Sequence, residues 1–515
     1  MRELTEAEKL EIAGCLNAGR PLPDKYRFLL FEHKCGYELV WDGKQERAAV
    51  PRQQLRRNLR SGINPEFARP ADKGPRQCAR QESLWMDKLI WGDNRLILSA
   101  LLQEPVRNEI NAQGGLKLIY IDPPFCTDAD FSMALPSGCQ SGIPEVAYRD
   151  KWETPAAFLA MIHERLLLMH ELLAPDGSIY VHCDWRMNSC LRLMLDEIFG
   201  NYVNEICWHY TGGGRSGKYF SRKHDSILVY SKSGHFIFNK DAIRIPYKQT
   251  SSYAKGGIRA RSGKTYFPHP SGTVPDDVWD IPIINPLARE RLGYPTQKPE
   301  ALLERIIKTS SRPGDLVADF FCGSGTFPAV AAKLGRKWLA ADSGRLAILV
   351  SRKRLLQGLR ETGSSRSFEL WSLANGEAYS CVASAARVKS GSQAIHIEAT
   401  PRIRGNAVAI ELLGYKNENG LLPENSQSGW SGLIDYWAVD YNFGSGQIED
   451  AQNLRSHEAD FFNGSWHVWR NNPDQALELI SPYREAGPGK VTLAVEVVDI
   501  FGYSGITTFC VNLPC

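Results

Sequence analysis

Predicted strands and helices alternate through the middle of the chain, and this alternation constrains the fold more strongly than any other feature. The strands are short apolar runs, and turn-forming residues separate them from the helices. The predicted strands are Leu116–Ile121, Ser178–His182, Asp315–Asp319 and Lys337–Ala341, and the predicted helices are Phe158–Leu173, Asn188–Phe199 and Glu300–Ser310. Such alternation is typical of a parallel sheet covered by helices, so we expect an open, mostly parallel α/β sheet.

The last part of the chain has a different pattern. From about Ala394 onward, Gly and Pro turns separate short alternating strands such as Val491–Val498, which is typical of a small β-sandwich. A chain of 515 residues is also too long for one small domain. We therefore expect an N-terminal accessory unit with a basic linker over residues 1–83, an α/β core over residues 84–360 and a C-terminal all-β domain over residues 361–515.

Positive charge is concentrated in two segments, although the formal net charge is only +3. Pro51–Arg80 holds eight basic residues among prolines and glycines, so we predict a mobile basic linker there. Thr211–Lys264 holds twelve, interspersed with rings such as Tyr219 and Phe220. Cations that neutralise phosphates, mixed with rings that stack on bases, are typical of a nucleic-acid surface, and a solvated basic face is the alternative. Pro401–Cys515 has seven basic and fourteen acidic residues, so we expect no phosphate contact there.

An acid, two prolines and an aromatic residue directly follow the first predicted strand. These residues are Asp122, Pro123, Pro124 and Phe125, and they stand at the edge where open α/β sheets bind ligands. An exocyclic base amine is a poor nucleophile because its lone pair is delocalised into the ring. Asp122 and the Pro123 carbonyl can accept its two hydrogens, and the prolines hold both acceptors in place. Phe125 can stack on a base rotated out of a duplex.

A second loop has the pattern of a nucleotide-type cofactor site. The strand Asp315–Asp319 runs into a turn that contains Gly323 and Gly325, and a helix is predicted directly after it. The two glycines let a ligand approach the backbone. Seventeen residues after Gly325, Asp342 ends the next strand, where an acid can bind both hydroxyls of a ribose.

Other site types fit less well. A dinucleotide-binding loop requires Gly or Ala three residues after the second glycine, and Pro328 stands there. The segment Gly263–Thr265 is no ATPase loop, because Ile258 occupies the position of the required earlier glycine. The twelve cysteines include no CxxC pair, and His182–Asp184 is interpreted as a strand end with its loop. We therefore predict no metal site.

The order of these motifs resembles the β group of amino-methylating DNA methyltransferases, and the chain is similar to the modification subunits of type III restriction systems. In that group an Asp-Pro-Pro-Tyr/Phe motif precedes the cofactor glycine loop, and the target-recognition region lies between them. Here Asp122–Phe125, the basic aromatic segment and Phe321–Thr326 stand in that order, within a match over about Leu89–Leu356. The resemblance implies a Rossmann-like core dependent on S-adenosylmethionine, with a target-recognition insert at about residues 211–290.

The resemblance also implies roles for single residues. Thr296 and Lys298 are expected at the methionine end of the cofactor, Asp319 near its amine and Asp93 near its adenine. With the residues of the glycine loop, the expected cofactor-binding set is Asp93, Thr296, Lys298, Asp319, Phe321, Gly323, Gly325, Thr326 and Asp342. The expected DNA contacts are Arg215, Lys218, Arg222 and Lys223. Lys298 could instead merely lead into the following helix, and Asp93 could be a turn former.

The predicted function is site-specific methylation of adenine N6 in double-stranded DNA by direct transfer from S-adenosylmethionine. An acid-led motif is typical of the adenine enzymes of the group, and cytosine N4 is the alternative target. A second alternative is a non-catalytic DNA-recognition subunit of a restriction–modification system, and methylation of RNA or of a protein amide is the third.

The sequence also leads to expectations about the partners and the location of the protein. A second copy of the chain and a restriction subunit are candidate partners beside DNA. The sequence has no apolar run near the roughly 18 residues that span a bilayer. Met1–Leu10 carries three glutamates and has no apolar signal region, so we expect a cytoplasmic protein without a membrane partner.

Overall fold

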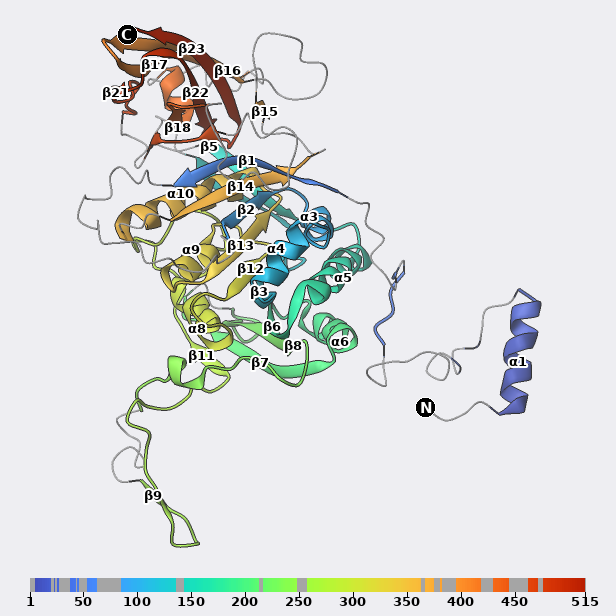
Figure 1. The fold of residues 1–515 in the computed structure, drawn as a ribbon. Coiled ribbons are helices and arrows are strands. Elements are labelled where there is room, and N and C mark those ends of the chain that lie inside the picture. The colour runs from blue at the N-terminus through green and yellow to red at the C-terminus, as the bar shows by residue number, and fades with distance from the viewer. Residues whose placement is uncertain are drawn as a thin grey trace.

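The computed structural model describes most of the chain. The described residues are 5–19, 23, 26, 38–42, 44–45, 53–62, 85–135, 143–212, 216–247, 257–362, 366–374, 380–381, 395–417, 429–443, 462–470 and 476–514. Figure 1 shows an α/β core, a group of C-terminal strands at one end and a long hairpin that projects from the other. The helix α1 (Glu6–Asn17) stands apart from the core and has no buried residue.

A large sheet forms the centre of the core. In the described residues it has eleven strands, in the spatial order β11 (Val278–Asp280), β7 (Asn201–His209), β8 (His224–Ser231), β6 (Leu173–Cys183), β3 (Leu116–Ile121), β12 (Leu316–Asp319), β13 (Lys337–Asp342), β2 (Asp87–Trp91), β14 (Ser367–Leu373), β1 (Leu55–Gly62) and β19 (Phe462–Asn463). Neighbours are antiparallel at β7–β8, β8–β6 and β14–β1 and parallel elsewhere. The predicted open, mostly parallel sheet is confirmed.

Helices cover both faces of this sheet. One face carries α3 (Asn94–Leu101), α4 (Val106–Ala112), α5 (Pro155–Leu172) and α6 (Asn188–Ile198), and the other carries α8 (Glu300–Ser310), α9 (Thr326–Lys333) and α10 (Arg345–Thr362). Helix α5 begins as its sequence predicts, because the Thr154 side chain accepts a hydrogen bond from the N–H of Ala157 and Pro155 needs no partner there. The central strands are continuous apolar runs because both of their faces are buried.

The boundaries of the core differ from the predicted ones. Leu55–Gly62 falls inside the predicted linker, yet it forms strand β1 and pairs with β14, for instance Leu55 with Leu373. Strand β14 lies beyond the predicted boundary at residue 360 and pairs with β2 in the core sheet. The sequence of β1 is mostly polar and lacks the alternation of apolar residues that predicts a strand. The remaining residues of the predicted linker, 63–80, lie outside the described residues.

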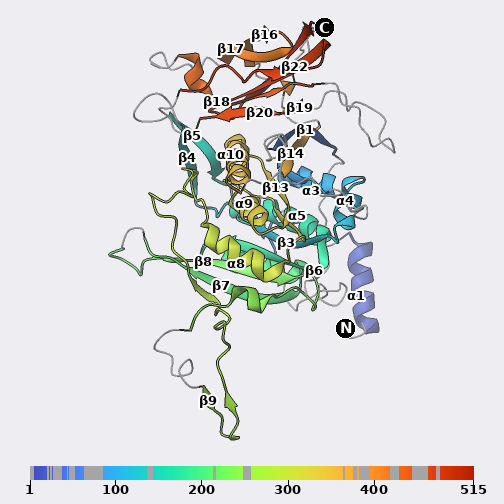
Figure 2. The same ribbon diagram turned by 60° about the vertical axis from the view of Figure 1, so that its left-hand side comes forward.

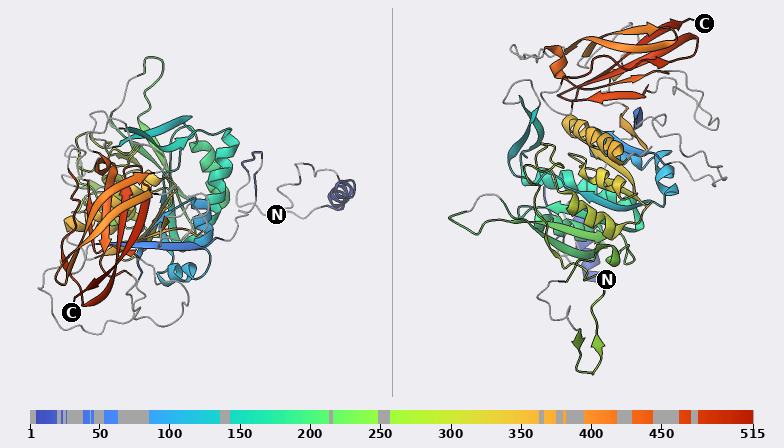
Figure 3. Two further views of the ribbon diagram at one scale, coloured as in Figure 1. Left: turned by 90° about the horizontal axis from the view of Figure 1, so that it is seen from above. Right: turned by 90° about the vertical axis from the view of Figure 1, so that its left-hand side faces the viewer.

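The C-terminal strands form two further sheets. One has the order β15 (Ser380–Cys381), β23 (Ser504–Leu513), β22 (Gly489–Asp499), β18 (Ile434–Asp440) and β20 (Trp466–Trp469), and the other has β16 (Ile395–Arg404), β17 (Ala407–Asn417) and β21 (Arg484–Glu485). Apolar side chains of both sheets share one buried cluster, as in a β-sandwich. We call these two sheets the C-terminal sandwich, and Figure 3 shows it stacked against helix α10.

Two hairpins extend from the core near the ends of its strands. The hairpin of β4 (Ala129–Leu135) and β5 (Ile143–Asp150) directly follows the Asp122–Phe125 loop and was not predicted. The hairpin of β9 (Ile258–Arg259) and β10 (Thr265–Tyr266) belongs to the insert at residues 211–290 and reaches far from the sheet (Figure 2). Among the described residues, no helix combines the length and the apolar composition that crossing a membrane requires.

Candidate active site

The two predicted loops meet because their strands are neighbours. In the register of the sheet, Tyr120 of β3 lies beside Asp319 of β12, and Asp342 of β13 lies beside Trp91 of β2. The loops that follow these strands therefore leave the sheet at one edge. They surround a cavity of about 480 Å³, within the size range of small-molecule sites.

Nearly all of the predicted site residues line this cavity. They are Asp93, Asp122, Pro123, Pro124, Phe125, Thr296, Lys298, Asp319, Phe321, Gly323, Thr326 and Asp342. Gly325 is the exception among the predicted catalytic and cofactor residues. It has a left-handed φ of 71°, and a Cβ there would lie 2.7 Å from Ser351 Oγ, so Gly325 allows the turn to pack against α10.

Asp122 has one engaged and one free carboxylate oxygen. Lys298 Nζ donates to Oδ2 at 2.5 Å, and both side chains are largely buried. Oδ1 is buried and has no hydrogen-bond partner. An unpaired buried acceptor costs stability, so its retention at a cavity wall indicates a site for a donor from a ligand. Lys298 thus orients the acid, a contact that its predicted role at the cofactor did not include.

Asp150 shapes the loop that carries Phe125. Its two carboxylate oxygens accept hydrogen bonds from the backbone N–H groups of Phe125, Cys126 and Thr127 at 2.9–3.0 Å, and from the Thr127 hydroxyl and the Trp152 indole. Cys126 has a left-handed φ of 59°, which these bonds help to hold. Sequence reasoning missed Asp150, because nothing in its neighbourhood marks an acid at the end of a hairpin strand as a loop anchor.

The segment that carries Lys298 is also held tightly. Thr296 has a left-handed φ of 55°, and its hydroxyl lies 2.9 Å from the hydroxyl of Tyr148 on β5. The side chain of Gln297 accepts from the N–H of Leu292 and donates to the carbonyl of Glu290. The segment is therefore tied both to Tyr148 of the cavity wall and to the backbone of residues 290 and 292 that precede it.

The glycine turn rests on Asp342. Gly323 donates its N–H to Asp342 Oδ2 at 2.8 Å, and Gly344 donates to Oδ1 at 2.8 Å. Gly323 has a φ of 49°, and a Cβ there would come within 3.3 Å of the ring of Tyr294. Burial raises the pKa of the Asp342 carboxyl, while these backbone donors lower it.

Asp319 is a deeply buried acid of the cavity wall. Burial raises the pKa of its carboxyl well above the usual range, and the charges of Asp122 and Asp342 raise it further, although the N–H of Phe321 donates to it at 2.9 Å. A buried acid in this state is poised to ionise when a cation binds beside it.

Asp93 has two structural contacts as well as its place in the cavity wall. It caps α3 by accepting from the N–H of Arg95, and Arg165 donates to the same oxygen at 2.7 Å. The neighbouring Asn94 donates to the carbonyl of Phe320, which leads into the glycine turn. The turn-former interpretation therefore describes part of what Asp93 does.

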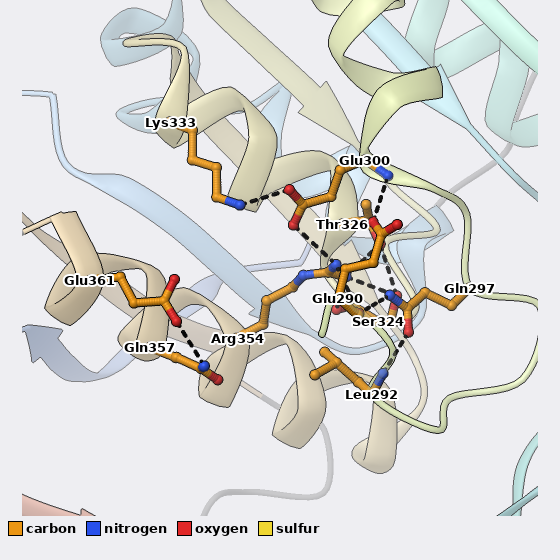
Figure 4. A network of polar contacts seen from close by, with 10 residues as sticks. All are labelled: Glu290, Leu292, Gln297, Glu300, Ser324, Thr326, Lys333, Arg354, Gln357 and Glu361. Atoms are coloured by element: carbon orange, nitrogen blue, oxygen red, sulfur yellow. Dashed lines mark hydrogen bonds and ion pairs between the residues drawn. The ribbon is translucent and has the colours of Figure 1, made fainter. Parts of the chain in front are cut away.

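Arg354 of α10 joins the glycine turn to the Lys298 segment. It donates to the Thr326 hydroxyl at 2.5 Å and to Glu300 at 3.3 Å, and Glu300 also pairs with Lys333 (Figure 4). Glu290 accepts from the N–H of Glu300, so both ends of the Lys298 segment enter the same network. Thr326, which lines the cavity, thus accepts a hydrogen bond at its hydroxyl from Arg354 outside the cavity wall.

A buried polar chain supports Phe125 from the neighbouring strand. The ring of His182 lies 5.7 Å from that of Phe125, and its nitrogens contact the Tyr120 hydroxyl at 3.0 Å and Asp225 at 3.2 Å. Burial tends to raise the pKa of Asp225, but the hydrogen bond and charge of His182 bring it below its usual value. The His182–Asp184 segment is thus a strand end whose first residue lies against the ring of Phe125 in the cavity wall.

The predicted DNA-binding residues lie on the loop between β7 and β8. This loop leaves the same sheet edge as the Asp122 loop, because β8 pairs with β6 up to Cys183 and β6 pairs with β3. Lys218 and Arg222 are exposed, and Arg222 stacks on Trp185 at 3.7 Å. Lys223 donates to the carbonyl of Gly212, and Arg215 lies outside the described residues. Phe220 at the tip is 99% exposed.

Comparison with known proteins gives a consistent picture. The model of a family described as DNA methylase matches residues 116–350. The type II methyltransferase M.EcaI of Enterobacter cloacae is 32% identical over 346 residues, which cover 55% of this chain and 73% of that protein. The DNA adenine methyltransferase YhdJ of Escherichia coli (strain K12) is 32% identical over 46% of this chain and 75% of its own length.

A solved structure of the M1.HpyAVI–SAM complex is 19% identical, covers 52% of this chain and 98% of its own, and has a TM-score of 0.34. The family model spans both loops of the cavity, and the similarity to M.EcaI and YhdJ covers most of those two proteins, so we conclude that this chain belongs to the DNA methylase family.

Proposed function

We propose that this chain methylates the N6 amine of adenine in DNA, with S-adenosylmethionine as the methyl donor. The observation that carries the proposal is the buried, unpartnered Oδ1 of Asp122, a residue of the cavity wall to which the glycine turn also belongs. The relative YhdJ is named as a DNA adenine methyltransferase. The acid at the head of the Asp122–Phe125 motif is typical of adenine enzymes.

Asp122 prepares the amine for attack. Its free Oδ1 accepts one amine hydrogen and the Pro123 carbonyl accepts the other, which draws the nitrogen toward a tetrahedral shape and localises its lone pair. Lys298 holds Oδ2, so the carboxylate cannot rotate away from this task. Both acceptors are in place before the base arrives, and little reorganisation remains for the reaction itself.

Phe125 receives the base. Its backbone is bound to Asp150 and its ring lies against His182, so the ring has a fixed position when an adenine stacks on it. The adenine must leave the duplex to reach this position, because its N6 is paired inside the stack. The His182 chain therefore acts on the base through Phe125, as a positioning element.

The residues around the glycine turn are the proposed cofactor site. In this proposal Asp342 binds the ribose hydroxyls, Asp319 binds the amine, and Phe321 and Gly323 allow the nucleoside to approach the backbone; all four line the cavity. The bound cofactor supplies an electrophilic methyl group on a sulfonium. The φ of 49° at position 323 and the Tyr294 ring, which would lie 3.3 Å from a Cβ there, both favour glycine.

Double-stranded DNA is the proposed partner of the insert. The loop with Lys218, Phe220 and Arg222 leaves the sheet at the edge of the cavity, so cations and exposed rings surround the entrance for a base. Cations bind phosphates, and exposed rings can stack on bases or enter the duplex.

The test is transfer of a labelled methyl group to DNA, followed by digestion and chromatography of the nucleosides. We expect label in N6-methyladenine. We expect Asp122→Ala to reduce turnover by about a thousandfold or more, because it removes an acceptor needed only in the transition state. Its affinity for S-adenosylmethionine, measured by calorimetry, should stay within about threefold.

Equal incorporation of label by Asp122→Ala and by the wild type would show that Asp122 has no role in methyl transfer. Label in N4-methylcytosine would correct the substrate, and binding of DNA without cofactor binding would favour a recognition subunit instead.

A further inference from the structure

Among the described residues, none of the C-terminal sandwich lines the cavity, yet the sandwich makes polar contacts to the helix that supports the glycine turn. Helix α10 lies between the two. One face of the helix touches the glycine turn, and another face is bound by strands β18 and β22 of the sandwich (Figure 3). Helix α10 therefore connects the sandwich to the wall of the cavity.

The cavity-side face of α10 supports the turn directly. Ser351 is fully buried, and its hydroxyl donates to the carbonyl of Gly323 at 2.9 Å. Gly325 packs against Ser351 so closely that a Cβ would lie 2.8 Å from the Ser351 Cα. One turn further on, Arg354 donates to the Thr326 hydroxyl and to the carbonyl of Ser324. The turn therefore depends on the position of α10.

The two residues between Ser351 and Arg354 are held by the sandwich. Arg352 makes a bidentate bond to Glu496 of β22, at 2.9 and 2.8 Å, and also donates to the Tyr436 hydroxyl. The Arg352 and Glu496 side chains are 3% and 0% exposed. Lys353 donates to both oxygens of Asp435 on β18. Bidentate pairs of this kind fix distance and orientation together.

Apolar contacts also link the sandwich, helix α10 and the cavity wall. One buried cluster contains Ala147 and Tyr294 of the cavity wall, Ala347 and Val350 of α10, and Val497 of the sandwich. At the start of α10, the Arg345 guanidinium stacks on Tyr503 at 3.7 Å. Closely packed interiors transmit a shift at one side to the other because they contain few voids.

We propose that the C-terminal sandwich positions the cofactor turn by holding α10 with Glu496 and Asp435. These are positioning residues, since neither touches the cavity. The proposal rests on the proposed function, because it takes the cavity as the S-adenosylmethionine site. It assigns to the C-terminal sandwich a role in cofactor binding that does not involve contact with DNA.

The test compares three variants of the full chain. Glu496→Gln and Asp435→Asn weaken the two contacts to α10, and Glu411→Gln is the matched control, because Glu411 pairs with Arg402 across β16 and β17, away from α10. We expect Glu496→Gln to raise the Kd for S-adenosylmethionine by about tenfold and Asp435→Asn by less, with Glu411→Gln unchanged.

Kinetics separate positioning from a loss of folded protein. A displaced turn raises the KM for S-adenosylmethionine and leaves kcat and the Kd for DNA nearly unchanged, whereas partial unfolding lowers kcat and leaves KM unchanged. Folded Glu496→Gln with the wild-type Kd for S-adenosylmethionine would overturn the proposal. If Glu496→Gln does not fold, then folded Asp435→Asn with the wild-type Kd for S-adenosylmethionine would overturn the proposal. A wild-type protein that does not bind S-adenosylmethionine would instead overturn the proposed function.

Discussion

The cavity and the insert at residues 211–290 are organised in opposite ways. Every acid of the cavity wall that we described is tied by backbone N–H groups or by a cation, from Asp150 with the Phe125 loop to Asp122 with Lys298. In the insert, Lys218 and Phe220 are exposed, and the β9–β10 hairpin projects from the sheet. Methyl transfer requires fixed atoms, and a DNA surface must adapt to a duplex, so the comparison separates a preorganised region from an adaptable one.

The largest effect should come from loosening the preorganised region. Asp150→Asn replaces one acceptor oxygen by a donor that opposes the N–H groups of the Phe125 loop. We expect kcat to fall by about a hundredfold, because a loop displaced by about 1 Å misplaces the base and its acceptors. Single-turnover assays at saturating DNA and cofactor would measure it. A variant with normal kcat would show that the Asp150 contacts do not control the loop.

A smaller effect is expected in the adaptable region. Lys218→Glu combined with Arg222→Glu should weaken DNA binding by about thirtyfold at low salt and make the salt dependence less steep, because phosphate contacts release counterions. Turnover at saturating DNA should change little. Lys490→Glu, at the exposed start of β22 in the C-terminal sandwich, is the matched charge reversal and should leave binding unaltered. An unchanged salt slope in the double variant would remove this loop from the DNA surface.

The smallest expected effect is a pH dependence of affinity, which we expect for cofactor binding in the cavity and not for DNA binding by the insert. Burial raises the pKa of Asp319, so the free protein favours its neutral form, whereas a bound amine cation favours the ionised form. Cofactor binding then releases a proton, so the affinity for the cofactor rises with pH. Calorimetry should show this rise for the wild type and a flat profile for Asp319→Asn. DNA affinity, which depends on Lys and Arg, should respond to salt and not to this pH change.

The two regions also differ in how far the sequence predicts them. The catalytic loop and the glycine turn were predicted from short strings, because each follows a buried apolar strand and the strand edge determines where its residues lie. Asp150 and His182 act through partners distant in the chain, such as Phe125 and Asp225, and local pattern does not reveal such pairs. Strand β1 was missed for a similar reason, since its pairing with β14 joins residues more than 300 positions apart.

The path of the insert has a consequence for evolution of the chain. Its first part is the loop between β7 and β8, and its longer part leaves the sheet after β8 and returns as β11, which pairs with β7. Loops whose ends are anchored in a sheet can gain or lose residues at small cost, since doubling a flexible loop adds only about 0.6 kcal/mol to its closure. New sequence preferences could thus be acquired by exchanging these two loops, while the chemistry of the parent enzyme is inherited intact.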